Sequence, residues 1–167
     1  YESGGYSDII KPYTSSDGLT FMVDIKVTDA VTDGPADYSK RFGDEQQWSR
    51  VNIITSTYEG DRYRYCTYNF GKGCFEIFGG GNWSYKDYDQ NPDVYKLIAT
   101  VDAEWTLNEW HELAMKTNGS VATIYFDGKK VLEGDWGSEV TDLQSYIILT
   151  CSYSNVYFDN MIVADKD

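Results

Sequence analysis

The sequence is poor in basic residues, and this shortage excludes several kinds of partner. It holds 14 lysines and arginines against 27 aspartates and glutamates, which gives a formal net charge of −13. Nucleic acids and anionic lipid surfaces are poor partners for such a chain, because basic side chains supply most of the affinity for both. A neutral ligand, or a cation such as calcium, suits the acidic chain better. No apolar run approaches the roughly 20 residues that a membrane-spanning helix needs.

Histidine and cysteine are also scarce, which limits catalysis and metal binding. No Ser–His–Asp set can be assembled around the single histidine, and three cysteines with one histidine match no zinc pattern. Hydrolysis of a glycosidic bond needs two carboxylates about 5 to 9.5 Å apart. The nearest approach is the stretch 133–139, whose Gly-rich spacing indicates a solvated acidic turn. We therefore expect His111 to be a buried structural residue, and we expect no enzymatic activity.

The three cysteines leave two alternatives open. Cys66 and Cys74 flank a predicted hairpin turn at Asn69–Gly73. They would form a disulfide if their Cα atoms came within about 7 Å of each other. The alternative is that Cys66, Cys74 and Cys151 are buried thiols that pack as small hydrophobic side chains.

Aromatic residues are abundant, with five tryptophans, fifteen tyrosines and seven phenylalanines among 167 residues. Many lie in short runs that alternate apolar with polar residues, as half-buried strands do. The predicted strands are 19–27, 51–58, 62–70, 74–78, 94–101, 110–117, 121–126, 129–132, 146–151 and 155–163. Asn118-Gly119 and Asp127-Gly128 favour two-residue hairpin turns between such runs. The pattern predicts a single all-β domain over residues 1–167, a two-sheet antiparallel β-sandwich.

The second half of the sequence resembles a known family. Residues 109–115 read Glu-Trp-His-Glu-Leu-Ala-Met, and residues 124–129 read Ile-Tyr-Phe-Asp-Gly-Lys. This pair resembles the adjacent strands of concanavalin A-like domains. The closing run 156–163 is similar to the last strand of these and related carbohydrate-binding jelly rolls. The resemblance implies a jelly-roll fold, which hosts lectins, laminin-G-like modules, glucanases, lyases and carbohydrate-binding modules.

The resemblance also implies a metal site. Jelly-roll carbohydrate-binding modules often hold a structural calcium between an early acidic residue and the last strand. Glu2 and Asp159 resemble those two positions, and hard oxygen ligands fit the acidic composition. The alternative is that Asp159 only caps a hairpin.

Two long loops carry the residue types that bind sugars. Sugar rings present an apolar C–H face and a rim of hydroxyls, so a site pairs aromatic platforms with polar side chains. The loop 79–93 sets three aromatic residues among Asn, Asp and Lys, and the loop 29–50 ends in a further tryptophan. The candidate platforms are Trp48, Trp83, Tyr85, Tyr88 and Trp136. Trp105 and Trp110 flank the concanavalin-like strand and are expected in the core.

Strand alternation adds a sheet surface. Glu76 faces outward if Phe75 and Ile77 face inward, and Tyr125 faces outward if its two neighbours face inward. The alternation of 62–70 is ambiguous. Turning its charges outward exposes Arg64 and Tyr68 and buries Tyr63 and Tyr65. The predicted concave binding face consists of Asn52, Arg64, Glu76 and Tyr125. The alternative for Arg64 and Glu76 is a surface ion pair of little energetic value.

These observations predict a non-catalytic carbohydrate-binding module that holds a neutral β-glycan of the plant cell-wall type. Because the chain opens at Tyr1 without a Met or an apolar leader, we expect a monomeric module of a larger, secreted enzyme. The alternatives are a glycoside hydrolase or polysaccharide lyase on the same fold, and a laminin-G-like adhesion module. The last would need an exposed apolar patch of several hundred Å².

Overall fold

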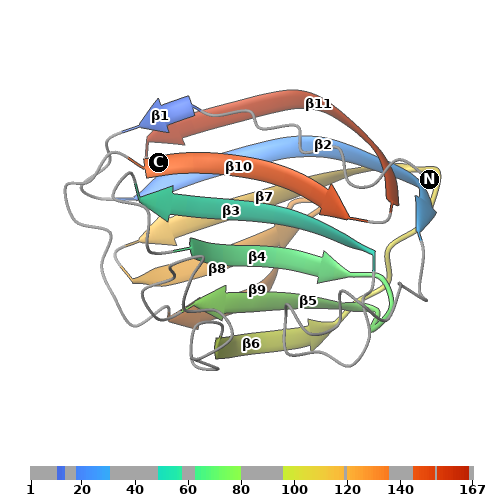
Figure 1. The fold of residues 1–167 in the computed structure, drawn as a ribbon, viewed down its shortest axis with the longest axis horizontal. Helices are drawn as coiled ribbons and strands as arrows, with labels where there is room; N and C mark the ends of the chain where they lie inside the picture. Colours follow the sequence, from blue (N-terminus) through green and yellow to red (C-terminus); the bar gives the residue numbers. More distant parts are fainter. Residues whose placement is uncertain are drawn as a thin grey trace, which may run out of the picture.

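The computed structural model describes residues 11–13, 18–30, 49–57, 63–79, 96–118, 120–135, 145–152 and 154–165. These residues form eleven strands in two antiparallel sheets that pack face to face (Figure 1). The predicted two-sheet β-sandwich is therefore confirmed. Within the described ranges, no helix has the length and apolar character that crossing a membrane requires.

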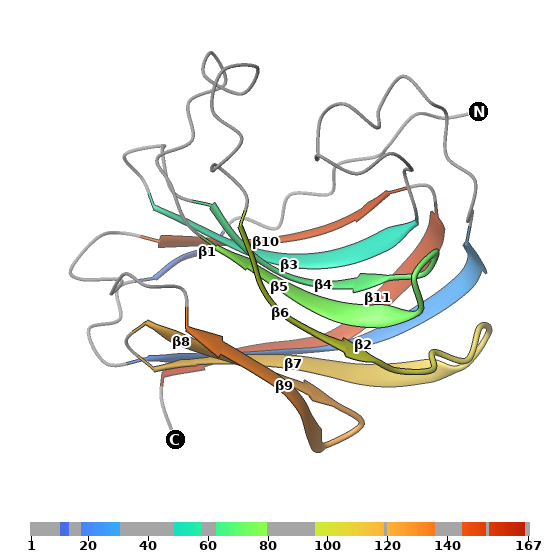
Figure 2. The same cartoon turned by 90° about the horizontal axis from the view of Figure 1, so that it is seen from below.

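One sheet has six strands and the other has five. In spatial order the six are β1 (Lys11–Tyr13), β10 (Ser145–Ser152), β3 (Arg50–Thr57), β4 (Tyr63–Asn69), β5 (Cys74–Gly79) and β6 (Lys96–Asp102). The five are β11 (Ser154–Asp165), β2 (Leu19–Ala30), β7 (Trp110–Asn118), β8 (Val121–Phe126) and β9 (Lys129–Asp135). Figure 2 shows β3, β4 and β5 bending toward the other sheet, so the outer face of the six-stranded sheet is concave.

All ten predicted strands are present, with ends that differ by a few residues, and β1 is an addition. The predicted turn at Glu133–Asp135 is wrong, because these residues belong to β9. Gly134 explains the difference, since it is buried where β9 packs across the sandwich against β6. A Cβ atom there would lie 3.0 Å from Ile98 Cγ2, so any larger residue would force the side chains of β6 to shift.

The core follows from the alternation. Phe21, Val23 and Ile25 of β2 are at most 1% exposed, and they pack against inward-facing residues of the other sheet such as Ile53 and Phe75. At the two-residue turn between β8 and β9, Asp127 has φ 48° and Gly128 has φ 72°, as the Asp-Gly pair predicts.

The cysteines are all unbridged. Cys66 pairs with Ile77 and Cys74 pairs with Asn69, so the two cysteines are three register positions apart. They also occupy opposite faces of the six-stranded sheet, because Cys66 shares its face with the inward Tyr68 and Cys74 alternates with the inward Phe75. A Cys66–Cys74 disulfide is therefore excluded, and the alternative of three thiols holds.

Gly18 has a conformation and a location that both require glycine. Its φ is +137°, and a Cβ atom there would overlap the carbonyl oxygen of Thr117. We expect Gly18→Ala to lower the free energy of unfolding by about 2–4 kcal/mol, measured by urea denaturation. The control is Gly128→Ala, which has a positive φ but no atom within 4 Å of the added Cβ. Its cost should be about 1–2 kcal/mol, and equal costs for the two variants would contradict the steric argument.

Candidate functional site

A polar cluster lies on the concave outer face of the six-stranded sheet. Val51 and Ile53 face the core, so Arg50 and Asn52 alternate to the outer face. The register then places Arg50 beside Asn69, and Asn52 beside Thr67, which in turn pairs with Glu76. Three neighbouring strands thus bring an arginine, two amides, a hydroxyl and a carboxylate to one surface.

The centre of this cluster is the Glu76 carboxylate, and its residue is only 1% exposed. Lys72 Nζ lies 3.3 Å from Oε1, Asn69 Nδ2 donates to Oε2 at 3.3 Å, and Arg50 Nη2 lies 3.8 Å from Oε2. We call Arg50, Asn69, Lys72 and Glu76 the Glu76 cluster. A carboxylate buried in this way is stable only because cations and donors surround it.

The turn between β4 and β5 builds the cluster. Asn69 is fully buried, its backbone oxygen accepts from Gly73 N at 2.8 Å, and its Oδ1 accepts from Lys72 N at 3.2 Å. The same side chain therefore closes the turn with its oxygen and binds Glu76 with its amide nitrogen. The result fixes Lys72, whose side chain is 39% exposed, at the rim of the cluster, with Arg50 11% exposed beside it.

Two further features of this face suit a ligand that carries hydroxyls. The Thr67 hydroxyl is buried and has no hydrogen-bond partner among the described residues. One register row further along the sheet, Phe78 pairs with Tyr65 on one side and with Leu97, which is 45% exposed, on the other. The outer face thus sets polar rows beside an apolar and aromatic row.

The cysteine on this face is not a nucleophile. Burial raises the pKa of Cys74, and the nearby Glu76 carboxylate adds to the effect, while a hydrogen bond with Thr100 and the Lys72 ammonium oppose it. The thiol is therefore neutral at physiological pH, and a neutral thiol attacks poorly.

The predicted alternation is confirmed in β5 and wrong in β4. Glu76 does alternate with the inward Phe75 and Ile77, but its burial rules out the surface ion pair considered with Arg64. Tyr68, predicted to be exposed, is 3% exposed and donates to the Ala103 carbonyl at 2.8 Å. Burial raises its pKa to about 12.

The orientation of β4 rests on its second half. Cys66 and Tyr68 face the core, and Thr67 and Asn69 alternate to the outer face. The side chains of Tyr63, Arg64 and Tyr65 lie outside the described ones, so the role of Arg64 stays a prediction. Tyr68 decides the alternation because it packs edge-on against Phe75, with ring centroids 4.8 Å apart.

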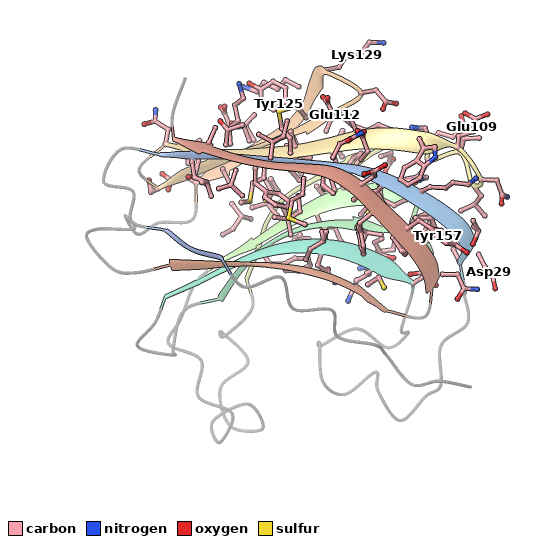
Figure 3. All side chains as sticks on the ribbon, turned by 90° about the horizontal axis from the view of Figure 1, so that it is seen from above. Asp29, Glu109, Glu112, Tyr125, Lys129 and Tyr157 are labelled. Atoms are coloured by element: carbon pink, nitrogen blue, oxygen red, sulfur yellow. The ribbon has the colours of Figure 1, made fainter. Side chains whose placement is uncertain are left out.

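Tyr125 is on a different surface from the rest of the predicted binding face. It belongs to β8 of the five-stranded sheet, where its ring lies 5.2 Å from Lys116 Nζ on the outer side (Figure 3). It therefore cannot share a ligand with Asn52 and Glu76 on the opposite side of the sandwich. The single concave face predicted for Asn52, Arg64, Glu76 and Tyr125 is wrong in this respect.

Most of the remaining predicted site residues lie outside the part of the chain that the structure describes. Trp48, Trp83, Tyr85, Tyr88, Trp136 and Glu2 lie outside the described residues, and their roles stay predictions. Asp159 is exposed, and its Oδ1 accepts from Asn160 N at 2.8 Å. Within the described ranges no group of three or more His, Cys, Asp or Glu side chains could hold a metal ion, so calcium also stays a prediction.

The two tryptophans expected in the core, Trp105 and Trp110, differ in burial. Trp105 is 7% exposed and packs on Phe126 with centroids 4.9 Å apart, as expected. Trp110 is 51% exposed, so its assignment to the core is wrong. His111 is structural, as predicted, because Nδ1 lies 2.9 Å from Asp127 Oδ2 and Nε2 lies 3.1 Å from the Thr106 carbonyl.

Sequence reasoning missed three members of the Glu76 cluster, namely Arg50, Asn69 and Lys72. Arg50 lies two residues before Asn52, which belongs to the predicted binding face. The period of two therefore places Arg50 on the same face of the strand as Asn52. The sequence predicts the turn Asn69–Gly73. It does not reveal the hydrogen bond from Asn69 to Glu76, because that contact depends on the register between β4 and β5.

Comparisons with known proteins place this architecture. No protein-family model matches the sequence, and no curated protein matches it. Carbohydrate-binding module CBM66 from Bacillus subtilis superposes with a TM-score of 0.58 at 14% identity, covering 90% of this chain and 76% of that one. A variant of human galectin-16 superposes with a TM-score of 0.63 at 10% sequence identity, and the match covers 98% of this chain and 99% of that one. The alginate lyase AlgAT5 of polysaccharide lyase family 7 superposes with a TM-score of 0.53 at 13% sequence identity, and the match covers 92% of this chain and 62% of that one. The chain therefore has the galectin-like, concanavalin A-like β-sandwich fold.

Proposed function

We propose that the chain is a non-catalytic carbohydrate-binding domain that holds a neutral β-glycan on the concave face of the six-stranded sheet. The observation that carries this proposal is the Glu76 cluster, in which a buried carboxylate orients two cationic side chains at the rim of a face that also has an apolar row. Donors held in place in this way can bind sugar hydroxyls without first being ordered, which lowers the entropic cost of binding. The fold is one that a carbohydrate-binding module and galectins share.

The absence of catalysis belongs to this proposal. Glu76 is buried and engaged by Lys72 and Asn69, so its carboxylate is not placed to protonate a glycosidic oxygen. His111 has both ring nitrogens occupied by partners, the Asp127 carboxylate and the Thr106 carbonyl. We further propose that the domain acts outside the cell as a monomeric module of a plant cell-wall-degrading enzyme, in keeping with its acidic charge and its preference for an uncharged ligand.

The test uses the two rim cations of the cluster. We expect the wild-type chain to be retarded in affinity gels that contain a neutral soluble β-glucan or xylan. Arg50→Ala and Lys72→Ala should each weaken binding roughly 10-fold or more, because hydrogen bonds from charged donors contribute about 1.5–3 kcal/mol. Lys129→Ala is the matched control, since this exposed lysine is the first residue of β9 in the other sheet, outside the proposed site.

Two results would overturn the proposal. One is a wild-type chain that no neutral polysaccharide retards, or whose retardation neither substitution weakens. The other is release of reducing ends from such a polysaccharide by the wild-type chain, which would identify a hydrolase. Release of unsaturated products from a uronate-containing polysaccharide would instead identify a lyase.

A further inference from the structure

The outer face of the five-stranded sheet carries a row of exposed aromatic residues. Lys26 of β2 pairs with Trp110 of β7 on one side and with Tyr157 of β11 on the other. Trp110 is 51% exposed and Tyr157 is 58% exposed. Both point away from the core, because His111, Val156 and Phe158, their neighbours in sequence, pack inward. This row is on the opposite side of the sandwich from the Glu76 cluster.

The spacing of the row suits an extended ligand. Trp110 and Tyr157 are two strands apart, which corresponds to about 9.5 Å in the plane of a sheet. That separation is on the scale of a disaccharide repeat. Lys26 lies between the two rings in register, where the aliphatic part of a lysine can cover the sheet while its ammonium group donates to hydroxyls.

Carboxylates border the row and are held in place. The next outward row along the strands contains Asp24, Glu112 and Asp159. Asn160 donates from Nδ2 to Asp24 Oδ2 at 2.7 Å and from its backbone nitrogen to Asp159 Oδ1 at 2.8 Å. Asn160 has φ 50° and lies at the register shift between Asp159 and Ile162. A β-bulge of this kind re-aims side chains, and here it orients two acceptors.

The negative charge around Trp110 and Tyr157 favours an uncharged ligand. Exposed Asp29 and Glu109 lie at the same end of the sheet as Tyr157 (Figure 3). Lys26 is thus one cation among several carboxylates, so chains rich in uronate or sulfate would be repelled. Carboxylates accept hydrogen bonds from sugar hydroxyls, and the aromatic rings stack on the apolar faces of the sugars.

We propose that Trp110 and Tyr157 form a second platform, which binds a neutral glycan chain across β7, β2 and β11. The platform would let one domain contact two glycan chains, or two segments of one chain, from opposite sides. Two weak sites on one domain raise the effective affinity for an insoluble polysaccharide without any new contact between the sites.

The experiment measures binding to a neutral β-linked tetrasaccharide by calorimetry and to its insoluble polymer by depletion. It uses Trp110→Ala, Tyr157→Ala and the double variant, all in an Arg50→Ala/Lys72→Ala background that weakens binding at the concave face. Calorimetric unfolding checks that this background is folded, and the aromatic variants are otherwise measured in the wild-type chain. Each single substitution should weaken tetrasaccharide binding roughly 2- to 12-fold, the range for one aromatic stacking contact. The effects should multiply in the double variant. Ile162→Ala, at a residue that is 51% exposed on the same face, is the control and should bind like its parent.

The result separates this proposal from the previous one, because the aromatic substitutions act on the outer face of the five-stranded sheet, whereas Arg50→Ala and Lys72→Ala act on the opposite side of the sandwich. The platform is refuted if that background binds no neutral glycan, or if the aromatic double variant binds as well as its parent. It is equally refuted if a lysine-rich peptide binds the parent and is lost in the double variant while no glycan binds. That outcome would identify a protein-binding surface.

Discussion

Replacement of Glu76 by alanine should lower the free energy of unfolding by about 2–4 kcal/mol and abolish glycan binding on the concave face. The carboxylate is almost fully buried, and its removal takes away the ion pair with Arg50, whose side chain is 11% exposed, and the hydrogen bonds with Asn69 and Lys72. Breaking a buried ion pair by deleting one partner typically costs about 3–5 kcal/mol. The lower end applies here because Lys72, which is 39% exposed, can turn to water.

The companion variant is Glu76→Gln, which keeps the shape of the side chain and an acceptor for Asn69 but removes the charge. It should cost less stability than alanine, about 1–2 kcal/mol, and it should still weaken binding because Arg50 and Lys72 lose the group that orients them. Urea denaturation gives the stabilities, and affinity gels give the binding. A Glu76→Ala variant as stable as the wild type would show that the carboxylate does not hold the cluster together.

Trp105→Ala should be the most damaging substitution among the described tryptophans. The indole joins the inner faces of both sheets, with ring centroids 5.0 Å from Tyr68 and 4.9 Å from Phe126. Truncation of a buried tryptophan costs about 3–5 kcal/mol, which for a domain of this size lowers the midpoint of thermal unfolding by roughly 10 °C. Calorimetry measures both quantities.

Trp110→Ala is the matched control, since the same residue type is removed five positions away from a side chain that is 51% exposed. Its effect on stability should stay within about 0.5 kcal/mol. Should Trp105→Ala fail to fold, Trp105→Phe keeps an aromatic ring and gives a smaller, measurable loss. Equal losses for Trp105→Phe and Trp110→Phe would contradict the assignment of Trp105 to the core.

The fold could be predicted from the sequence because its signal is local. Residues 19–27 alternate so regularly that β2 and its buried face follow from the pattern, and Asp127-Gly128 marks its own turn. The alternation of residues 110–117 also predicts that Trp110 is exposed. If His111 faces the core with Leu113 and Met115, the residue before it must face outward.

The candidate site could be predicted only in part because it depends on contacts between strands. Both alternation sets of β4 contain tyrosines, and only the packing of Tyr68 against Phe75 and Trp105 decides which set is buried. Arg50 and Glu76 are on strands that flank β4 and do not pair with each other, so their contact follows from two registers together. No local pattern encodes that information.

The order of strands in the five-stranded sheet has a consequence for the synthesis of the protein. β2, near the start of the described chain, hydrogen-bonds along most of its length to β11, near its end. Although β2 can pair with β7 earlier, its other edge therefore remains unpaired until β11 leaves the ribosome. Contacts this distant in sequence form slowly, and an apolar edge that waits for its partner is open to association with other chains. The acidic charge of the chain opposes that association during the delay.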